Sequence, residues 1–293
     1  MQAQVVLIPD ESKKLIAHGL LALDAVQSAL KKGLVVLHPS STTLFVYEAI
    51  LGRRPEPGRP WVSGQILPRG LCASKNTIQR MAASHESMND PLDNRNAWVF
   101  RNGRLQEGLR LGDILNEIRP ADVYVKAPNA MDPEGNTGVL YANPAGGGGT
   151  IGRVIARWRK ERFHLLLPAG LEKLLPISIE EAAKKARGRR ADRAMGMPCG
   201  LMPVPGQKID ERDAIRVLSG AEATPIAAGG LGGAGGAVTL AIYGEAEKVE
   251  RALAAVDQVK GARLPPLDLL QCGDCPNPYC HLRGRQDRSW LTV

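Results

Sequence analysis

The N-terminal fifty residues alternate between helix-like and strand-like apolar patterns. Of all the sequence features, this alternation constrains the fold most. Apolar residues recur at helical spacing over residues 13–32, which predicts one amphipathic helix ending before Gly33. Leu34–Leu37 is a short continuous apolar run, typical of a strand buried on both faces of a parallel sheet. A polar turn at residues 39–43 follows, and then a second helical pattern. Helix, strand, turn and helix in this order predict an α/β fold.

The same alternation continues to about residue 195. Further strands are predicted at residues 97–100, 122–126 and 164–167, further helices at 111–118, 150–160 and 179–187, and loops at 53–70 and 128–136. We therefore expect residues 1–195 to form a three-layer α/β sandwich.

The composition of the sequence changes around residues 195–206, where Pro198, Pro203 and Pro205 are closely spaced. Beyond this predicted boundary, the patterns indicate helices at residues 209–218 and 245–259 and strands at 223–228 and 237–243, with a glycine-rich hairpin loop at 229–236. This order predicts a small α+β, ferredoxin-like domain at residues 196–264. Residues 265–293 form a cysteine-bearing tail that begins at two prolines.

Length and composition fit such an organisation. A chain of 293 residues with 44% hydrophobic and 23% charged residues can bury a substantial core and is not of the disordered class. No apolar stretch approaches the ~20 residues that span a bilayer, so we expect no membrane association. The first ten residues lack a basic segment followed by an apolar run, so we also expect no secretory signal and a cytoplasmic location.

The net charge of +8, from 38 basic and 30 acidic residues, raises the question of a nucleic-acid partner. The basic residues concentrate at 153–162 and 184–193, both with helical spacing and acidic neighbours, and aromatic residues make up only 4% of the chain. Stacking platforms for bases are therefore scarce. Solvated helix faces explain the charge better, and a nucleic-acid partner is not expected. The sequence leaves open whether the chain forms a homo-oligomer.

Two patches of the chain carry a family resemblance. The first is the turn Pro39-Ser40-Ser41-Thr42 after the first strand. The second runs from Arg119 to Ala156; it contains a strand, then Asn129-Ala130-Met131-Asp132, then the glycine run 146–149 and a basic helix. Together they resemble the ribose-5-phosphate isomerase branch of the sugar-isomerase and CoA-transferase fold superfamily, and the looser Asn-x-x-Asp ending is similar to that of sugar-responsive sensor domains. The resemblance implies an α/β fold with an anionic ligand at the strand ends.

The isomerase chemistry itself is not retained. The positions of the isomerase's two loop carboxylates fall on Lys126 and Asn129, that of its general base on Val154, and that of the lysine before the glycine run on Ala145. Moving a proton between adjacent carbons requires such a carboxylate. We therefore expect the fold without isomerase activity.

The remaining polar groups predict a binding site for an anionic small molecule, which would be phosphorylated, carboxylated or of the CoA type. Ligands of open α/β sheets lie beyond the carboxyl ends of the strands, and backbone N–H groups at a helix N-terminus attract anions. The predicted ligand-binding residues are Ser40, Ser41, Thr42, Lys126, Asn129, Asp132, Gly146, Gly147, Gly148 and Gly149. His38 lies just before the first turn and could face the ligand, and Glu172, after the predicted strand at 164–167, could serve as a carboxylate.

The tail predicts a metal site. Cys272 and Cys275 form a Cys-x-x-Cys pair, Cys280 follows five residues later, and glycine and proline lie between them. Such spacing brings thiolates to one metal. A fourth ligand could come from Cys199, His281 or Cys72. Zinc and a [4Fe–4S] cluster remain equal alternatives.

These features leave three functions open. The chain is a cytoplasmic protein, with or without an enzymatic reaction, that binds an anionic small molecule and carries a metal in its tail. Alternatively, it is a non-catalytic ligand sensor or scaffold with a structural zinc. In the third alternative it is an iron–sulfur protein whose tail cluster does redox or Lewis-acid work.

Overall fold

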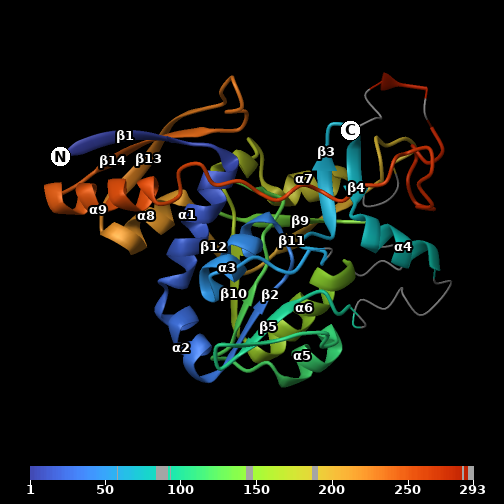
Figure 1. Cartoon of the computed structure of the whole chain (residues 1–293), viewed down its shortest axis with the longest axis horizontal. Coiled ribbons are helices and arrows are strands. Elements are labelled where there is room, and N and C mark those ends of the chain that lie inside the picture. The colour runs from blue at the N-terminus through green and yellow to red at the C-terminus, as the bar shows by residue number, and fades with distance from the viewer. Residues whose placement is uncertain are drawn as a thin grey trace.

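The computed structural model describes residues 1–57, 59–83, 92, 94–142, 148–186, 191–285 and 287–289. Predicted features at residues 143–147 and 187–190, which include Gly146 and Gly147, lie outside this part of the chain. Within it, the strands form four sheets (Figure 1).

The largest sheet has six strands and positions the candidate site. Its order is β12 (Gln207–Ile209), β10 (His164–Pro168), β7 (Val123–Val125), β2 (Leu34–Leu37), β5 (Trp98–Arg101) and β6 (Arg104–Gln106). The first four strands run parallel, whereas β5 is antiparallel to β2 and β6 is antiparallel to β5. The sheet is therefore mixed, and the predicted α/β class is confirmed.

Helices cover both faces of this sheet because its strands bury side chains on both sides. On one face, Val35, Leu37 and Val125 pack with the helices α1 (Pro9–Leu21), α2 (Asp24–Lys32) and α3 (Ser41–Leu51). On the other face, Val36 and Tyr124 pack with α5 (Leu111–Glu117) and α6 (Gly149–Glu161). Figure 1 shows the two helix groups on opposite sides of the strands.

The predicted single helix over residues 13–32 is wrong: it is two helices, α1 and α2. The chain leaves the helical path at Ala22 and Leu23, and the backbone of Leu23 is extended, with φ −68° and ψ 135°. The break has a packing reason. The face of α1 contacts α3 and α8 (Glu211–Ser219), whereas α2 turns its Val26 and Ala29 toward the central sheet.

A second, antiparallel sheet has the order β1 (Gln2–Leu7), β14 (Val238–Tyr243) and β13 (Glu222–Ala228). Its inner face packs against α8 and α9 (Ala246–Asp257). The hairpin of β13 and β14 around the glycine-rich loop was predicted and is confirmed. The N-terminal strand β1 was not predicted.

Strand pairing crosses the predicted boundary after residue 195. The third sheet pairs β11 (Gly200–Val204) with β9 (Thr137–Tyr141), which in turn pairs with β8 (Ala130–Met131). Likewise, β12 pairs with β10, and β1 completes the small sheet from the other end of the chain. Both sides of the predicted boundary therefore share sheets.

The segment 53–70, predicted as a loop, contains β3 (Gly64–Leu67), which forms a hairpin with β4 (Gly70–Ala73). The remaining elements are α4 (Lys75–Ala83), the short 3₁₀ helix η3 (Leu171–Lys173) and α7 (Ile179–Ala186). The tail passes β3, β4 and α4, as Figure 1 shows, and has neither strand nor α-helix in its described residues. No helix in the described ranges is long and apolar enough to cross a lipid bilayer.

Candidate functional site

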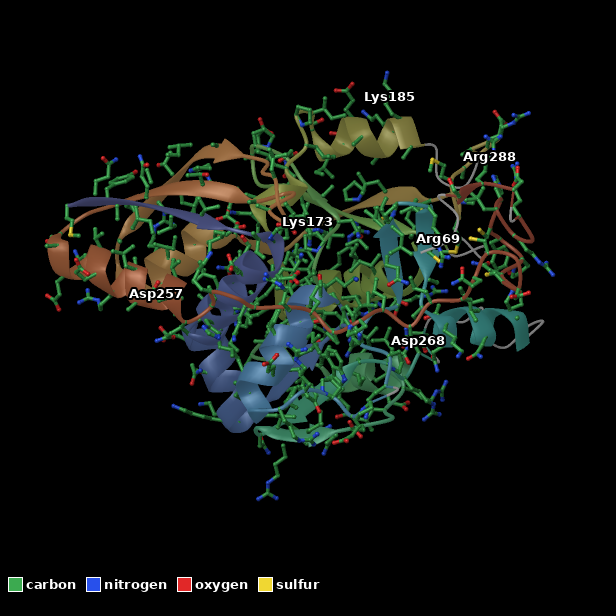
Figure 2. The ribbon with its side chains drawn as sticks, turned by 45° about the horizontal axis from the view of Figure 1, so that its top comes forward. Arg69, Lys173, Lys185, Asp257, Asp268 and Arg288 are labelled. Atoms are coloured by element: carbon green, nitrogen blue, oxygen red, sulfur yellow. The ribbon has the colours of Figure 1, made fainter. Side chains whose placement is uncertain are left out.

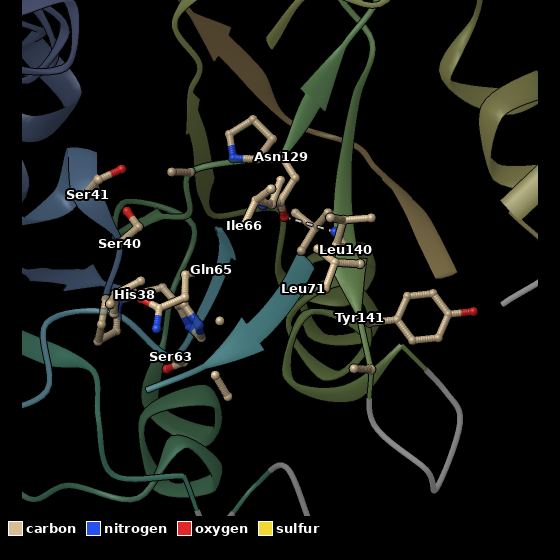
Figure 3. Close-up of a pocket in the computed structure, with 18 of the residues that line it drawn as sticks. His38, Ser40, Ser41, Ser63, Gln65, Ile66, Leu71, Asn129, Leu140 and Tyr141 are labelled. Carbon is tan, nitrogen blue, oxygen red and sulfur yellow. Dashed lines mark hydrogen bonds between the residues drawn. The ribbon is translucent and has the colours of Figure 1, made fainter. Parts of the chain in front are cut away.

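A cavity of about 1250 Å³ lies where the parallel strands of the central sheet end (Figure 3). His38 directly follows β2, Lys126 directly follows β7, and η3 follows β10, so three neighbouring strands deliver residues to the same wall. This is the position at which open α/β sheets bind ligands.

The turn after β2 presents the N-terminus of α3 to the cavity. Ser40 caps this helix: its Oγ accepts a hydrogen bond from the backbone N–H of Thr43 at 3.2 Å. The Thr43 hydroxyl donates to the backbone oxygen of His38 at 2.7 Å and holds the turn in place. Among the described residues, the backbone N–H groups of Ser41 and Thr42 have no hydrogen-bond acceptor. Free N–H groups and the helix dipole together favour an anion here.

Three lysines and one carboxylate make up the charged residues on the described wall: Lys13, Lys126, Lys173 and Glu172. Burial, and next the positive charge of Lys173, lower the pKa of Lys126 to about 8. Lys173 donates from Nζ to the backbone oxygen of Pro128 at 3.0 Å, and Lys13 lies 3.6 Å from a Glu172 carboxylate oxygen. Within the described ranges, the ammonium group of Lys126 has no hydrogen bond or ion pair. Lys126 is therefore the cation best placed to receive a charge from a ligand.

His38 and Glu172 contribute groups that can exchange protons. Burial, and next Lys126, hold the pKa of His38 well below its usual value, so its imidazole is neutral at pH 7. Its Nδ1 lies 3.1 Å from the Tyr124 hydroxyl. The Oε2 of Glu172 is buried and has no hydrogen-bond partner in the described part of the chain. The wall thus combines a neutral imidazole, a carboxylate and three amines.

Other parts of the wall are largely apolar. They include Trp61, Leu71, Leu264 and Tyr279. Gln65 of β3 is a polar residue of the wall (Figure 3). Both polar atoms of its side chain are buried without a partner among the described residues. The cavity wall therefore combines cationic and apolar parts.

The structure brings most, but not all, of the predicted ligand-binding residues together. Ser40, Ser41, Lys126 and Asn129 lie on the described cavity wall. Asn129 also has a structural role, because its Oδ1 accepts the backbone N–H of Leu140 at 2.9 Å (Figure 3).

Thr42 and Asp132 do not line the cavity, which differs from their predicted role. The Thr42 side chain is fully buried, and its hydroxyl has no partner within the described ranges. Asp132 instead holds two loops together by accepting the backbone N–H groups of Asn136 at 2.8 Å and Ile179 at 3.0 Å. Both its oxygens are thus engaged within the fold.

The glycine run leads into α6, and Gly148 and Gly149 lie on the cavity wall. Gly148 has φ +74°, a conformation that favours glycine, and a Cβ there would overlap with the Met202 side chain. Gly146 and Gly147 lie outside the described residues. A second helix N-terminus therefore reaches the cavity beside that of α3.

Lys13, Lys173 and Gln65 are cavity residues that sequence reasoning missed. Lys173 follows β10 as Lys126 follows β7, so the rule that ligands gather at strand ends could have found it. Lys13 belongs to α1 and Gln65 to β3. Neither carries a sequence signal, because only tertiary packing brings α1 and the β3–β4 hairpin to the strand ends.

The cysteines form a second group of chemically active residues. Cys275 and Cys280 of the tail pack with Cys72 of β4 against Ala73, Ile78 and Met197. Burial is the main cause of the raised pKa values of Cys275 and Cys280. In the described part of the chain, no three His, Cys, Asp or Glu side chains are arranged to hold a metal ion.

The two residues named first as a fourth metal ligand, Cys199 and His281, are not part of the cluster that contains Cys72, Cys275 and Cys280. Cys199 is on the cavity wall, where burial raises the pKa of its thiol to about 11, and its Sγ lies 3.6 Å from the backbone oxygen of Met197. His281 is exposed, and its backbone N–H donates to Gly196 at 3.0 Å.

Comparisons of the sequence and the fold with known proteins found no relative. The chain matches no family model, no curated protein and no solved structure.

Proposed function

We propose that this protein binds an anionic small molecule, phosphorylated, carboxylated or of the CoA type, in the cavity at the strand ends. The observation that carries the proposal is the unpaired ammonium group of Lys126 beside the N-terminus of α3. An ammonium ion on a partly desolvated wall and free N–H groups on the adjacent helix both favour the same kind of group.

The size and the mixed lining of the cavity narrow the ligand class. Cavities for small ligands commonly enclose ~300–1,000 Å³, and this one is larger, at about 1250 Å³. An anionic group would lie between Lys126, Lys173 and Ser41. The apolar hairpin and tail residues would contact the rest of the molecule. This favours an anion that carries a sizeable apolar or extended group over a small phosphosugar.

The same proposal includes the finer fold assignment and the cellular location. Four parallel strands in a mixed sheet, with a Ser-rich turn after one strand and a glycine run before a helix, support a sugar-isomerase-like arrangement. We assign the protein to the cytoplasm because its cysteine usage suits a reducing compartment.

Ligand binding is tested by calorimetry on the full chain with acetyl-CoA, ribose 5-phosphate and succinate as probes. At least one probe is expected to bind, acetyl-CoA most tightly. Lys126→Met should weaken that binding at least tenfold, which corresponds to about 1.4 kcal/mol. Lys32→Met is the matched control, because Lys32 is exposed at the far end of α2.

The pH dependence gives an independent readout. Lys126 loses its positive charge as the pH rises through its pKa of about 8, so affinity should fall between pH 7.5 and 9. The Lys126→Met variant should show a flatter profile. If no probe binds, or if Lys126→Met and Lys32→Met both bind like the unmodified protein, the cavity is not an anion site.

A metal in the tail is the second part of the proposed function. The packing of Cys275 and Cys280 beside β4 supports it, because thiols from separate segments already share one environment. Zinc there would be structural, whereas an iron–sulfur cluster could also do redox or Lewis-acid work.

A further inference from the structure

The tail cysteines lie against a cysteine that is two hundred residues away in sequence. Cys72 of β4 belongs to the same small hydrophobic cluster as Cys275 and Cys280. Cys272 lies three residues before Cys275, and its backbone oxygen accepts the N–H groups of Cys275 at 3.4 Å and of Gly284 at 2.9 Å. Sulfur atoms lie close to the labelled Arg69 in Figure 2, where the tail meets β4.

Several hydrogen bonds tie the tail to the β3–β4 hairpin and its neighbours. Arg69 donates from Nη2 to the backbone oxygen of Leu270 at 2.8 Å and lies 3.9 Å from the Cys72 sulfur. The backbone N–H of Lys75 donates to Asp268 at 3.2 Å. The approach of Cys72 to the tail is therefore built into the fold by contacts on both sides of the thiols.

The charge and the loop structure of this region suit thiolate ligands. The buried guanidinium group of Arg69 lies 3.9 Å from the Cys72 sulfur, and its positive charge would offset the negative charge of a thiolate centre. Residues 271–284 consist of turns, bends and irregular backbone, with hydrogen bonds such as Cys280 N–H to the backbone oxygen of Asn277 at 3.4 Å. Such a segment can close around a metal without disturbing a helix or strand.

We propose that Cys72, Cys272, Cys275 and Cys280 together ligate one thiophilic metal centre that fastens the tail to β4. Cys72, rather than Cys199 or His281, is the fourth ligand. Four thiolates match structural zinc, with Zn–S bonds of ~2.3 Å, and also an iron–sulfur cluster. In either case the cysteines would bind the metal as thiolates, so metal binding is coupled to pH.

The proposal is tested by metal analysis of anaerobically purified full-length protein expressed with added iron and with added zinc. About one zinc per chain, or about four irons with broad visible absorbance, is expected. Cys72→Ser should lose the metal as fully as Cys275→Ser does. Cys199→Ser is the matched control and should retain it, because Cys199 is not part of the cluster that Cys72 shares with Cys275 and Cys280.

A second measurement avoids reliance on variants that fold poorly. Alkylation of the unmodified protein, read by mass spectrometry, should show Cys72 protected together with the three tail cysteines and exposed together with them by a chelator. Cys199 should not respond to the chelator. Full metal content in Cys72→Ser, alkylation of Cys72 in the metal-bound protein, or no stoichiometric metal in the unmodified protein would each overturn the proposal. The inference rests on the tail metal of the proposed function: no stoichiometric metal overturns both, whereas full metal content in Cys72→Ser overturns only the assignment of Cys72. Probe binding in the cavity is scored separately.

Discussion

Burial has a direct effect on the acidity of the Glu211 side chain. Glu211 is the first residue of α8, it is fully buried, and its two oxygens accept the backbone N–H of Leu171 at 3.2 and 3.0 Å. Burial, and next the charge of Glu172, raise the pKa of Glu211 to about 7. The folded protein therefore holds a proton that the unfolded chain releases at lower pH.

This proton makes the stability pH-dependent in a defined direction. Between pH 4.5 and 7 the folded state binds more protons than the unfolded state, so the contribution of Glu211 to stability falls as pH rises. The free energy of unfolding falls by about 3 kcal/mol at most from this cause. Glu211→Gln removes this slope and keeps a hydrogen-bond acceptor for Leu171. Urea unfolding should therefore show the variant gaining stability, relative to the unmodified protein, at pH 8 compared with pH 5.

The exposed carboxylate of Glu250 provides the matched control. Glu250→Gln should change stability equally at both pH values. The same behaviour in Glu211→Gln would contradict a raised pKa for Glu211.

At the same scale, side-chain type alone did not separate ligand-facing residues from structural ones. Ser41 and Thr42 are adjacent polar residues at one helix start, yet only Ser41 lines the cavity. Asp132 occupies the position that the resemblance assigned to the ligand and instead joins two loops. A helical step of ~100° between neighbours decides which side chain faces the cavity, and composition does not carry that direction.

Among the elements, β4 joins the central part of the molecule to the tail. The backbone of Leu71 donates to Met195 at 3.1 Å and accepts from Met197 at 2.8 Å, while Gly196 between them accepts the N–H of His281. Gly196 has φ +82°, and a Cβ there would overlap with the carbonyl oxygen of Leu71. Only glycine allows three segments to approach so closely.

Gly196→Ala is expected to destabilise the protein by about 2 kcal/mol or more, since both backbone strain and steric overlap oppose the native contact. Gly52→Ala separates the two causes, because Gly52 has a similar φ of +68° but open space around it. Thermal unfolding should show a smaller loss of stability for Gly52→Ala than for Gly196→Ala. Only Gly196→Ala should speed alkylation of the tail cysteines. Equal losses and equal alkylation rates would show that the close contact does not hold the tail.

At the level of the whole molecule, the N-terminus stabilises the C-terminal part of the chain. Strand β1 pairs with β14 along its full length, from Gln2 opposite Tyr243 to Leu7 opposite Val238. Leu7 is fully buried in the core beneath this sheet, whereas Val6 is 49% exposed on the other face. The two ends of the sequence therefore share one core.

Leu7→Ala should cost ~2–5 kcal/mol of unfolding free energy, and Val6→Ala under about 1 kcal/mol. Hydrogen exchange should also quicken in β13, β14 and α9 for Leu7→Ala, although these elements lie more than two hundred residues away. Unchanged exchange there would mean that the small sheet is stable without β1.

Local pattern was enough to predict the elements that bury a continuous or periodic apolar set, such as β2, β10, α6 and the β13–β14 hairpin, and with them the α/β class. Their apolar spacing follows from the backbone geometry of each element and needs no partner to be recognised. The rule that ligands gather at the carboxyl ends of parallel strands pointed to the edge where the cavity lies, and ligand binding there stays a prediction.

The break between α1 and α2, the addition of β1 to the small sheet, and the arrival of Lys13, Gln65 and Cys72 at their sites depend on tertiary structure. These outcomes result from which surfaces pack together, and the free energy of that packing involves residues far apart in the chain. A sequence pattern of ten or twenty residues carries no information about such contacts. The charges that surround Lys126, and the cysteine that faces the tail, therefore emerge only once the chain has folded.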